Sequence, residues 1–227
     1  MAPSEERYTR ANPSPRYREL LGFYEHMHRH GDPEAGLDPE DTFDGRSLPP
    51  QAPKIAHIIS RTGARTLLDY GSGKGKQYAP QTISFGDGTT FDSVAQWWGV
   101  ESITCFDPGY PEHATLPTGK FDGVVCTDVM EHCPAEDLPW ILDEIFGYAR
   151  KFVFLSVAQY PAVKTLPNGE NAHCTIESTE WWGQRFLAAS AAHPEVEYFV
   201  SFVSRKKAPD GTVRPEEALF HGGGKGG

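Results

Sequence analysis

Short apolar runs alternate with segments of helical periodicity along most of the chain. The runs are brief and bounded by Gly, Asp or Pro, which is typical of strands buried on both faces of a parallel sheet. The strands expected from these runs cover residues 66–68, 102–106, 121–126, 151–157 and 195–204. The segments between them predict helices over residues 17–30, 54–61, 92–98, 137–148 and 178–192. Strands that alternate with helices predict an α/β fold with a doubly wound, mostly parallel sheet flanked by helices.

Three segments depart from regular alternation. Residues 81–91 contain Gly86-Asp87-Gly88 between β-prone residues, which predicts a small hairpin. Only a dozen or so residues separate Asp107 from the next expected strand, too few for a helix and a strand, so we expect this third region of the sheet to be reduced. An Asp-Gly turn at 208–211 and a short return strand at 218–221 predict a terminal antiparallel hairpin.

The hydropathy pattern divides the chain into an N-terminal arm with a covering helix over residues 1–50, one domain over 51–221, and a Gly-rich tail over 222–227. Residues 1–16 lack an apolar period and are expected to form a mobile arm, and the tail GGGKGG has no means of ordering itself. His26, His28 and His30 lie two apart, which spreads them around a helix, so we expect solvated surface histidines.

Composition narrows the classes of function. The chain has 227 residues with 38% hydrophobic content, enough for a sizeable core, and its net charge of -10 disfavours a nucleic-acid partner. Residues 1–10 lack an apolar signal region and no apolar run is long enough to cross a bilayer, so we expect a cytoplasmic protein without a membrane partner. The four cysteines show no C-x-x-C spacing, which favours reduced thiols.

The chemistry centres on residues 66–78, TLLDYGSGKGKQY, where an apolar strand ending at Asp69 leads into Gly71, Gly73 and Gly75. Such a loop lets backbone approach a ligand closely, and its spacing differs from the G-x-G-x-x-G of dinucleotide-binding folds. Asp-x-Gly-x-Gly-x-Gly after a strand resembles motif I of class I S-adenosylmethionine (SAM) dependent methyltransferases. The segment 121–132, FDGVVCTDVMEH, strongly resembles the segment that follows the fourth strand in many small-molecule members of that family.

The resemblance implies a Rossmann-like methyltransferase fold and a set of residues around SAM. The acid that ends the second strand, Asp107, resembles the residue that bonds both ribose hydroxyls, since a carboxylate can accept two donors. The expected cofactor-binding residues are Asp69, Gly71, Ser72, Gly73, Gly75, Tyr78, Asp107, Pro108, Thr127, Asp128 and Val129. Gln51 and Lys54, just ahead of motif I, are candidates for the carboxylate of SAM, with ordinary surface positions as the alternative.

Methyl transfer to a hydroxyl also requires a base. His132 and His173 are the candidates, because each follows a strand expected near the cofactor and imidazole titrates near neutral pH, and Asp128 could orient one of them or touch the amino group of SAM. A packing role for His132 remains an equal alternative. The long loop after the fifth strand is expected to hold substrate, with Tyr24, Tyr160 and Trp181 as possible walls.

Asp128-x-x-Glu131-His132, followed about forty residues later by His173, resembles the metal-binding pattern of small-RNA 2'-O-methyltransferases. In that family two Glu and two His bind the ion, whereas here the first acid is Asp and the acidic charge disfavours RNA. The dipeptides His132-Cys133 and His173-Cys174 offer a weaker zinc alternative. A divalent metal is therefore possible but not expected.

The sequence as a whole predicts a SAM-dependent methyltransferase that acts on a small polar acceptor through a hydroxyl. The alternatives are a metal-assisted RNA 2'-O-methyltransferase and a SAM-binding regulator without catalysis. A nicotinamide oxidoreductase is disfavoured by the glycine spacing.

Overall fold

The computed structural model describes residues 7–32, 36–207 and 211–224. A six-stranded sheet has the order β4-β1-β5-β6-β7-β8. Its strands are β4 (Ser102–Phe106), β1 (Thr66–Tyr70), β5 (Phe121–Thr127), β6 (Ala149–Ala158), β7 (Glu197–Lys207) and β8 (Val213–Gly223). Neighbouring strands from β4 to β7 run parallel, and β8 pairs antiparallel with β7. The expected α/β class with a mostly parallel, helix-flanked sheet is therefore confirmed.

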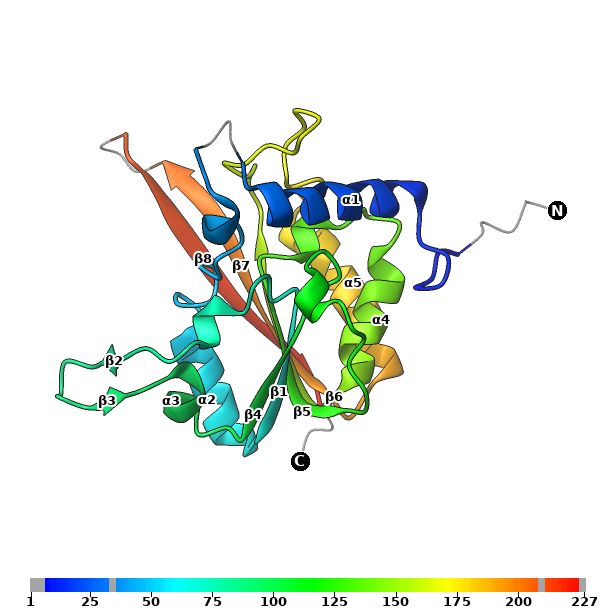
Figure 1. Ribbon diagram of the computed structural model, residues 1–227. Helices are drawn as coiled ribbons and strands as arrows, with labels where there is room; N and C mark the ends of the chain where they lie inside the picture. Colours follow the sequence, from blue (N-terminus) through cyan, green and yellow to red (C-terminus); the bar gives the residue numbers. More distant parts are fainter. Residues whose placement is uncertain (1–6, 33–35, 208–210, 225–227) are drawn as a thin grey trace.

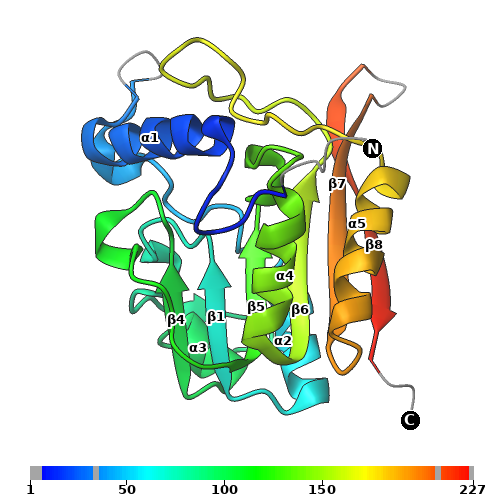
Figure 2. The same cartoon turned by 90° about the vertical axis from the view of Figure 1, so that its right-hand side faces the viewer.

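Helices cover both faces of the sheet, as Figures 1 and 2 show. Alternate strand residues belong to two separate cores: Leu68, Val124 and Val153 pack with α4 (Leu138–Tyr148) and α5 (Thr179–Ala192). On the other face, Leu67, Val125 and Phe154 pack with α2 (Ala52–Thr62) and α3 (Val94–Trp98). The period of two along each strand thus explains why short, wholly apolar runs form the centre of the molecule.

The departures from regular alternation are also present. The strands β2 (Ile83–Ser84) and β3 (Thr90–Phe91) form the expected small hairpin. Between β4 and β5 the described chain contains only a short 3-10 turn, Pro111–His113, so the reduced third region is confirmed. The order reverses at β1, since β4 lies on one side of it and β5 on the other, and ligands of open α/β sheets bind beyond the strand ends at such a point.

The helix α1 (Pro15–His30) crosses above the carboxyl ends of the strands (Figure 2). Ser14 caps it by accepting a hydrogen bond from the backbone N–H of Tyr17, Pro15 occupies its first turn, and Gly31 ends it at a φ of 75°. The helix expected over residues 17–30 is therefore present, and it begins two residues earlier. No helix of the described residues has both the length and the apolar character that crossing a membrane requires.

The N-terminal segment differs from the expected mobile arm. The guanidinium of Arg10 bonds both carboxylate oxygens of Glu144 on α4, at 2.6 and 2.8 Å, and the hydroxyl of Tyr70 at 2.6 Å. It also lies over the ring of Trp140, 4.8 Å from the centroid. Residues 7–14 are thus fixed by tertiary contacts between distant side chains, and residues 1–6 lie outside the described chain.

The C-terminal end is more ordered than expected. The predicted return strand at 218–221 is part of an eleven-residue strand, β8, which includes Gly222 and Gly223 of the supposed tail. Position 222 requires glycine, because the Cβ of any other residue would lie 2.6 Å from the Tyr198 ring. The turn expected at 208–211 falls largely on 208–210, and the tail's end on 225–227, both outside the described residues.

Candidate functional site

A cavity of about 410 Å³ opens at the carboxyl ends of β1, β4 and β5, beneath α1. Its walls come from the glycine loop after β1, the ends of β4 and β5, α1, the segment 41–47 and the loop 160–173. The volume is within the range of small-molecule sites. Of the residues expected to bind the cofactor or to act in catalysis, ten line it: Gly71, Ser72, Gly73, Asp107, Pro108, Thr127, Asp128, Val129, His132 and His173.

The glycine loop is held close to two other walls of this cavity. At Gly71, whose φ is 83°, a Cβ would lie 2.4 Å from a methyl group of Val129. At Gly73, whose φ is 56°, a Cβ would lie 2.7 Å from the carbonyl oxygen of Phe43. Glycine is therefore required at both positions by backbone conformation and by the close approach of neighbouring chain.

Asp107 joins the end of β4 to the glycine loop. One carboxylate oxygen accepts from the backbone N–H of Gly73 and the other from that of Gly109, each at 2.8 Å. Burial raises the pKa of Asp107, while these two bonds lower it. Each oxygen keeps a second lone pair, so the group can still accept hydroxyl donors from the cavity.

Asp69, Gly75 and Tyr78 do not line the cavity. The strand β1 continues through Asp69, whose Oδ2 accepts from the hydroxyl of Tyr78 at 2.9 Å and from the amide of Gln77 at 3.1 Å. Its Oδ1 is buried without a partner among the described residues. Burial raises the pKa of Asp69 to about 7. These residues support the glycine loop from behind.

The end of β5 carries an unusual backbone conformation. Asp128 has a φ of 61°, in the left-handed region that non-glycine residues rarely adopt. Its backbone N–H donates to the carbonyl and hydroxyl oxygens of Ser156 on β6, both at 3.1 Å. The side chain is exposed to the cavity. Local strain of this kind is often found where a side chain must be aimed at a functional site.

Both candidate histidines present the same ring nitrogen to backbone. The Nδ1 of His173 lies 2.6 Å from the carbonyl oxygen of Tyr160, and the Nδ1 of His132 lies 2.9 Å from that of Ala172. Because a carbonyl only accepts, we assign the proton to Nδ1 in each ring, which leaves the lone pair on Nε2. Burial, and then the neighbouring His173, lower the pKa of His132 to about 4, so that ring is neutral near pH 7.

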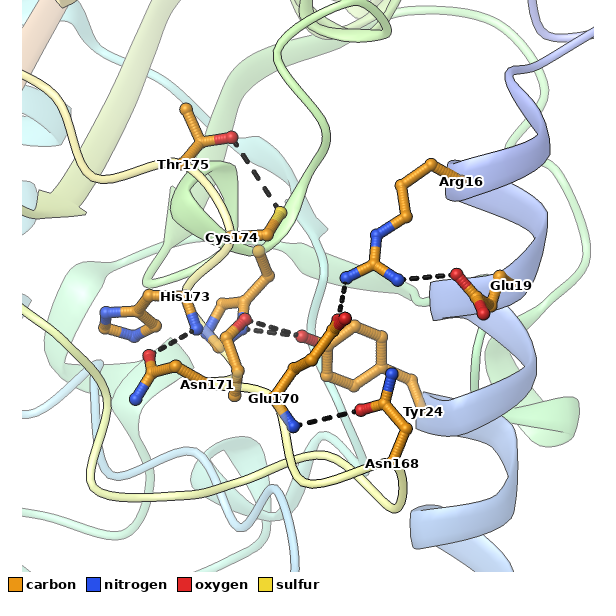
Figure 3. Close-up of polar contacts among 11 residues, drawn as sticks. Arg16, Glu19, Tyr24, Asn168, Glu170, Asn171, His173, Cys174 and Thr175 are labelled. Atoms are coloured by element: carbon orange, nitrogen blue, oxygen red, sulfur yellow. Dashed lines mark hydrogen bonds and ion pairs between the residues drawn. The ribbon is translucent and has the colours of Figure 1, made fainter.

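The helix α1 and the loop that bears His173 are tied together, as Figure 3 shows. The Tyr24 hydroxyl donates to the carbonyl oxygen of Ala172 at 3.0 Å and lies 2.8 Å from Nδ1 of His132. Arg16 on the same helix pairs with Glu170 of the loop (Figure 3). The side chain of Asn171 accepts from the backbone N–H of His173 at 3.0 Å, which braces the loop from within.

Asp128, His132 and His173 form a group with metal-ligand character. One ligand atom from each lies within 4.8 Å of the others. Beside them, Glu131 is fully buried: its Oε1 accepts from the backbone N–H of Ala158 at 2.5 Å, and its Oε2 has no partner among the described residues. Burial, and then Asp128, raise the pKa of Glu131 well above its usual value. One carboxylate and two imidazoles at this separation fit a divalent ion such as manganese or iron.

The cavity also contains residues that sequence reasoning missed. His28, expected on the surface, is 5% exposed, and its ring lies 4.6 Å from that of Phe43 and 5.0 Å from that of Tyr110. Its Nδ1 is 3.2 Å from the amino group of Lys74, and burial followed by that cation lowers its pKa to about 3. No local sequence signal marks this position, because its covering residues come from distant segments.

Three further residues expected at the site, Trp181, Gln51 and Lys54, do not line the cavity, whereas Tyr24 and Tyr160 do. Lys54 bonds the side chains of Gln51, at 3.2 Å, and Glu217, at 2.7 Å. These residues connect α2 to β8 instead.

Searches for similarity found no matching protein-family model, no matching curated protein and no matching solved structure. The site is therefore interpreted from its own geometry.

Proposed function

We propose that this protein is a SAM-dependent methyltransferase with a Rossmann-like methyltransferase fold, and that it methylates a hydroxyl group of a small polar acceptor. The observation that carries the proposal is the single cavity that joins the glycine loop and Asp107 to His132, His173 and Asp128. A cofactor loop and a set of proton-accepting side chains thus open into one space of suitable volume.

The residues present fit SAM. Backbone of the Gly71–Gly73 loop, the carboxylate of Asp107 and the segment 127–129 would hold it. When bound, SAM supplies a methyl group activated by its sulfonium. The protein's task is to exclude water, align the acceptor and accept its proton. The Nε2 lone pairs of His132 and His173 suit the last role, since both rings are fixed through Nδ1.

A second candidate is metal-assisted transfer, favoured by the grouping of Asp128, His132 and His173 with the unpartnered Oε2 of Glu131. A cation there would offset the carboxylate of Asp128 and that of the buried Glu131 beside it, and would leave the imidazoles as ligands rather than bases. Small-RNA ends are one acceptor class for such chemistry, so an oligoribonucleotide belongs in the acceptor panel.

The test is a native mass spectrum of the full chain with and without SAM, followed by transfer of labelled methyl to a panel of hydroxyl acceptors. We expect a bound mass of SAM or of S-adenosylhomocysteine, weakened at least tenfold by Asp107→Asn. The control is Glu101→Gln. Glu101 is an exposed carboxylate that precedes β4, whereas Asp107 follows it. Absence of any cofactor mass contradicts the proposal, and tight binding without transfer to any acceptor favours a non-catalytic regulator.

A further inference from the structure

Two cations line the cavity without a carboxylate partner. Among the described residues, neither Lys164 nor Arg205 takes part in a salt bridge, although both are cavity-lining. By contrast, Arg46 in the same wall pairs with Asp44 at 2.6 Å, and Lys206 beside Arg205 pairs with Glu216 at 3.1 Å. The carboxylate of Asp44 acts on Lys164 electrostatically, but the two do not form a salt bridge.

Aromatic rings hold both cations in place. The amino group of Lys164 lies 4.6 Å from the centroid of Phe43, and the guanidinium of Arg205 lies 4.2 Å from that of Tyr160. Such contacts fix a cation without cancelling its charge. Burial lowers the pKa of Lys164, which indicates that the half-buried amino group has lost part of its hydration.

Lys164 and Arg205 are each connected by a chain of contacts to one of the two histidines, His132 and His173. The carbonyl group of Tyr160, whose ring carries Arg205, bonds His173. Phe43, whose ring carries Lys164, packs edge-on against Tyr24 at 5.8 Å, and the Tyr24 hydroxyl reaches His132. A molecule that contacts both cations would therefore lie across the group formed by Asp128, His132 and His173.

We infer that the acceptor carries an oxyanion, a phosphate or a carboxylate, which Lys164 and Arg205 bind while a hydroxyl of the same small molecule lies at the Asp128, His132 and His173 group. This inference rests on the proposed methyltransferase function and names its substrate class. Sugar phosphates and polyhydroxy acids have this chemistry. Arg suits such a group because its guanidinium can donate to two oxygens at once.

The test uses calorimetric titration of the full chain saturated with S-adenosylhomocysteine. Ribose 5-phosphate is compared with ribose, and gluconate with glucose, so that each pair differs in charge at one end. We expect at least one anion to bind tenfold or more tightly than its neutral partner, and Lys164→Met or Arg205→Met to remove that preference. Lys206→Met is the control, since its side chain pairs with Glu216 outside the cavity.

Several outcomes overturn the inference. Equal binding within both pairs does so, as does a preference that survives both substitutions. If the substitutions weaken S-adenosylhomocysteine but not 5'-methylthioadenosine, the cations bind the carboxylate of the cofactor instead. A short oligoribonucleotide that alone loses affinity in the variants would point to RNA. Failure of the wild-type chain to bind S-adenosylhomocysteine contradicts the proposed function itself, whatever the anions do.

Discussion

The imidazole rings of His132 and His173 lie 4.6 Å apart, centroid to centroid, with their planes at 87°. One follows β5 and the other comes from the loop after β6. Each is oriented by a backbone carbonyl group, and the hydroxyl of Tyr24 also contacts the ring of His132. Such orientation is common to metal-binding and to proton-accepting histidines, and the following predictions separate the two.

Replacing either histidine should reduce methyl transfer without loss of the cofactor. We expect His132→Ala and His173→Ala each to lower turnover by about 100-fold or more, the usual contribution of general-base catalysis. The affinity for S-adenosylhomocysteine should change less than about threefold, because the glycine loop and Asp107 are untouched. The control is His30→Ala on the exposed side of α1. Unchanged turnover in both variants would show that the pair has only a structural role.

The metal alternative predicts stoichiometric binding of a transition metal. Titration with Mn²⁺, followed by its electron paramagnetic signal, should show about one ion per chain if the group is a metal site. Asp128→Asn should weaken binding by about tenfold to 100-fold, and His26→Ala, which is exposed, should not alter it. Metal removal by a chelator should then abolish transfer. Transfer that persists in the chelator, with no bound manganese, rejects this alternative.

Removal of the Arg10 contact should destabilise the fold. Arg10→Ala leaves Glu144, whose side chain is 16% exposed, and the Tyr70 hydroxyl without their partner. The expected loss is about 1–3 kcal/mol in the free energy of unfolding, measured by urea titration. Arg7→Ala, at an exposed position three residues earlier, is the control. An equal, negligible effect of both changes would mean that the segment 7–14 adds nothing to stability.

The buried acid behind the glycine loop makes stability depend on pH. Burial raises the pKa of Asp69 from 3.8 to about 7, although Tyr78 and Gln77 donate to it and lower the value, and Asp107 adds to the rise. Between these pH values the folded state holds a proton that the unfolded state has released. The stability this group contributes is therefore complete below pH 3.8 and is lost as the pH rises through about 7.

For one proton, the free energy of unfolding can change with pH by at most about 1.4 kcal/mol per pH unit. We expect Asp69→Asn to remove a large share of this pH dependence, as measured by urea titrations between pH 4.5 and 7.5. Glu101→Gln, an exposed change, should leave the slope as in the wild type. Identical slopes in the wild type and Asp69→Asn would mean that Asp69 is ionised in the folded protein.

The local pattern of apolar residues was sufficient to predict most strands of the sheet. The strand at 102–106 and the start of the strand at 121 agree with the structure, because apolar runs buried on both faces need no partner to be recognised. The long edge strand β8 was mostly missed, since it contains Pro215, Glu216 and Glu217 and is largely exposed. Its order comes from pairing with β7 along its whole length.

The site was predictable where a motif lies at a strand end. Gly71, Asp107 and His132 follow strands that the pattern located, so their meeting at one edge of the sheet followed from topology. His28, Lys164 and Arg205 were missed because each reaches the cavity through contacts with distant residues. No periodicity or spacing encodes such contacts.

The placement of α1 affects the order in which the protein can be assembled during translation. Arg10, which precedes the helix, bonds Glu144, 134 residues later in the chain. Tyr24, on the helix, bonds Ala172, 148 residues later. This helix therefore leaves the ribosome long before the chain that will hold it, and domains fold as that chain emerges. The cavity should acquire its cover only after the loop bearing His173 has been synthesised, so ribosome-bound chains arrested before that point are expected to expose the strand ends to protease.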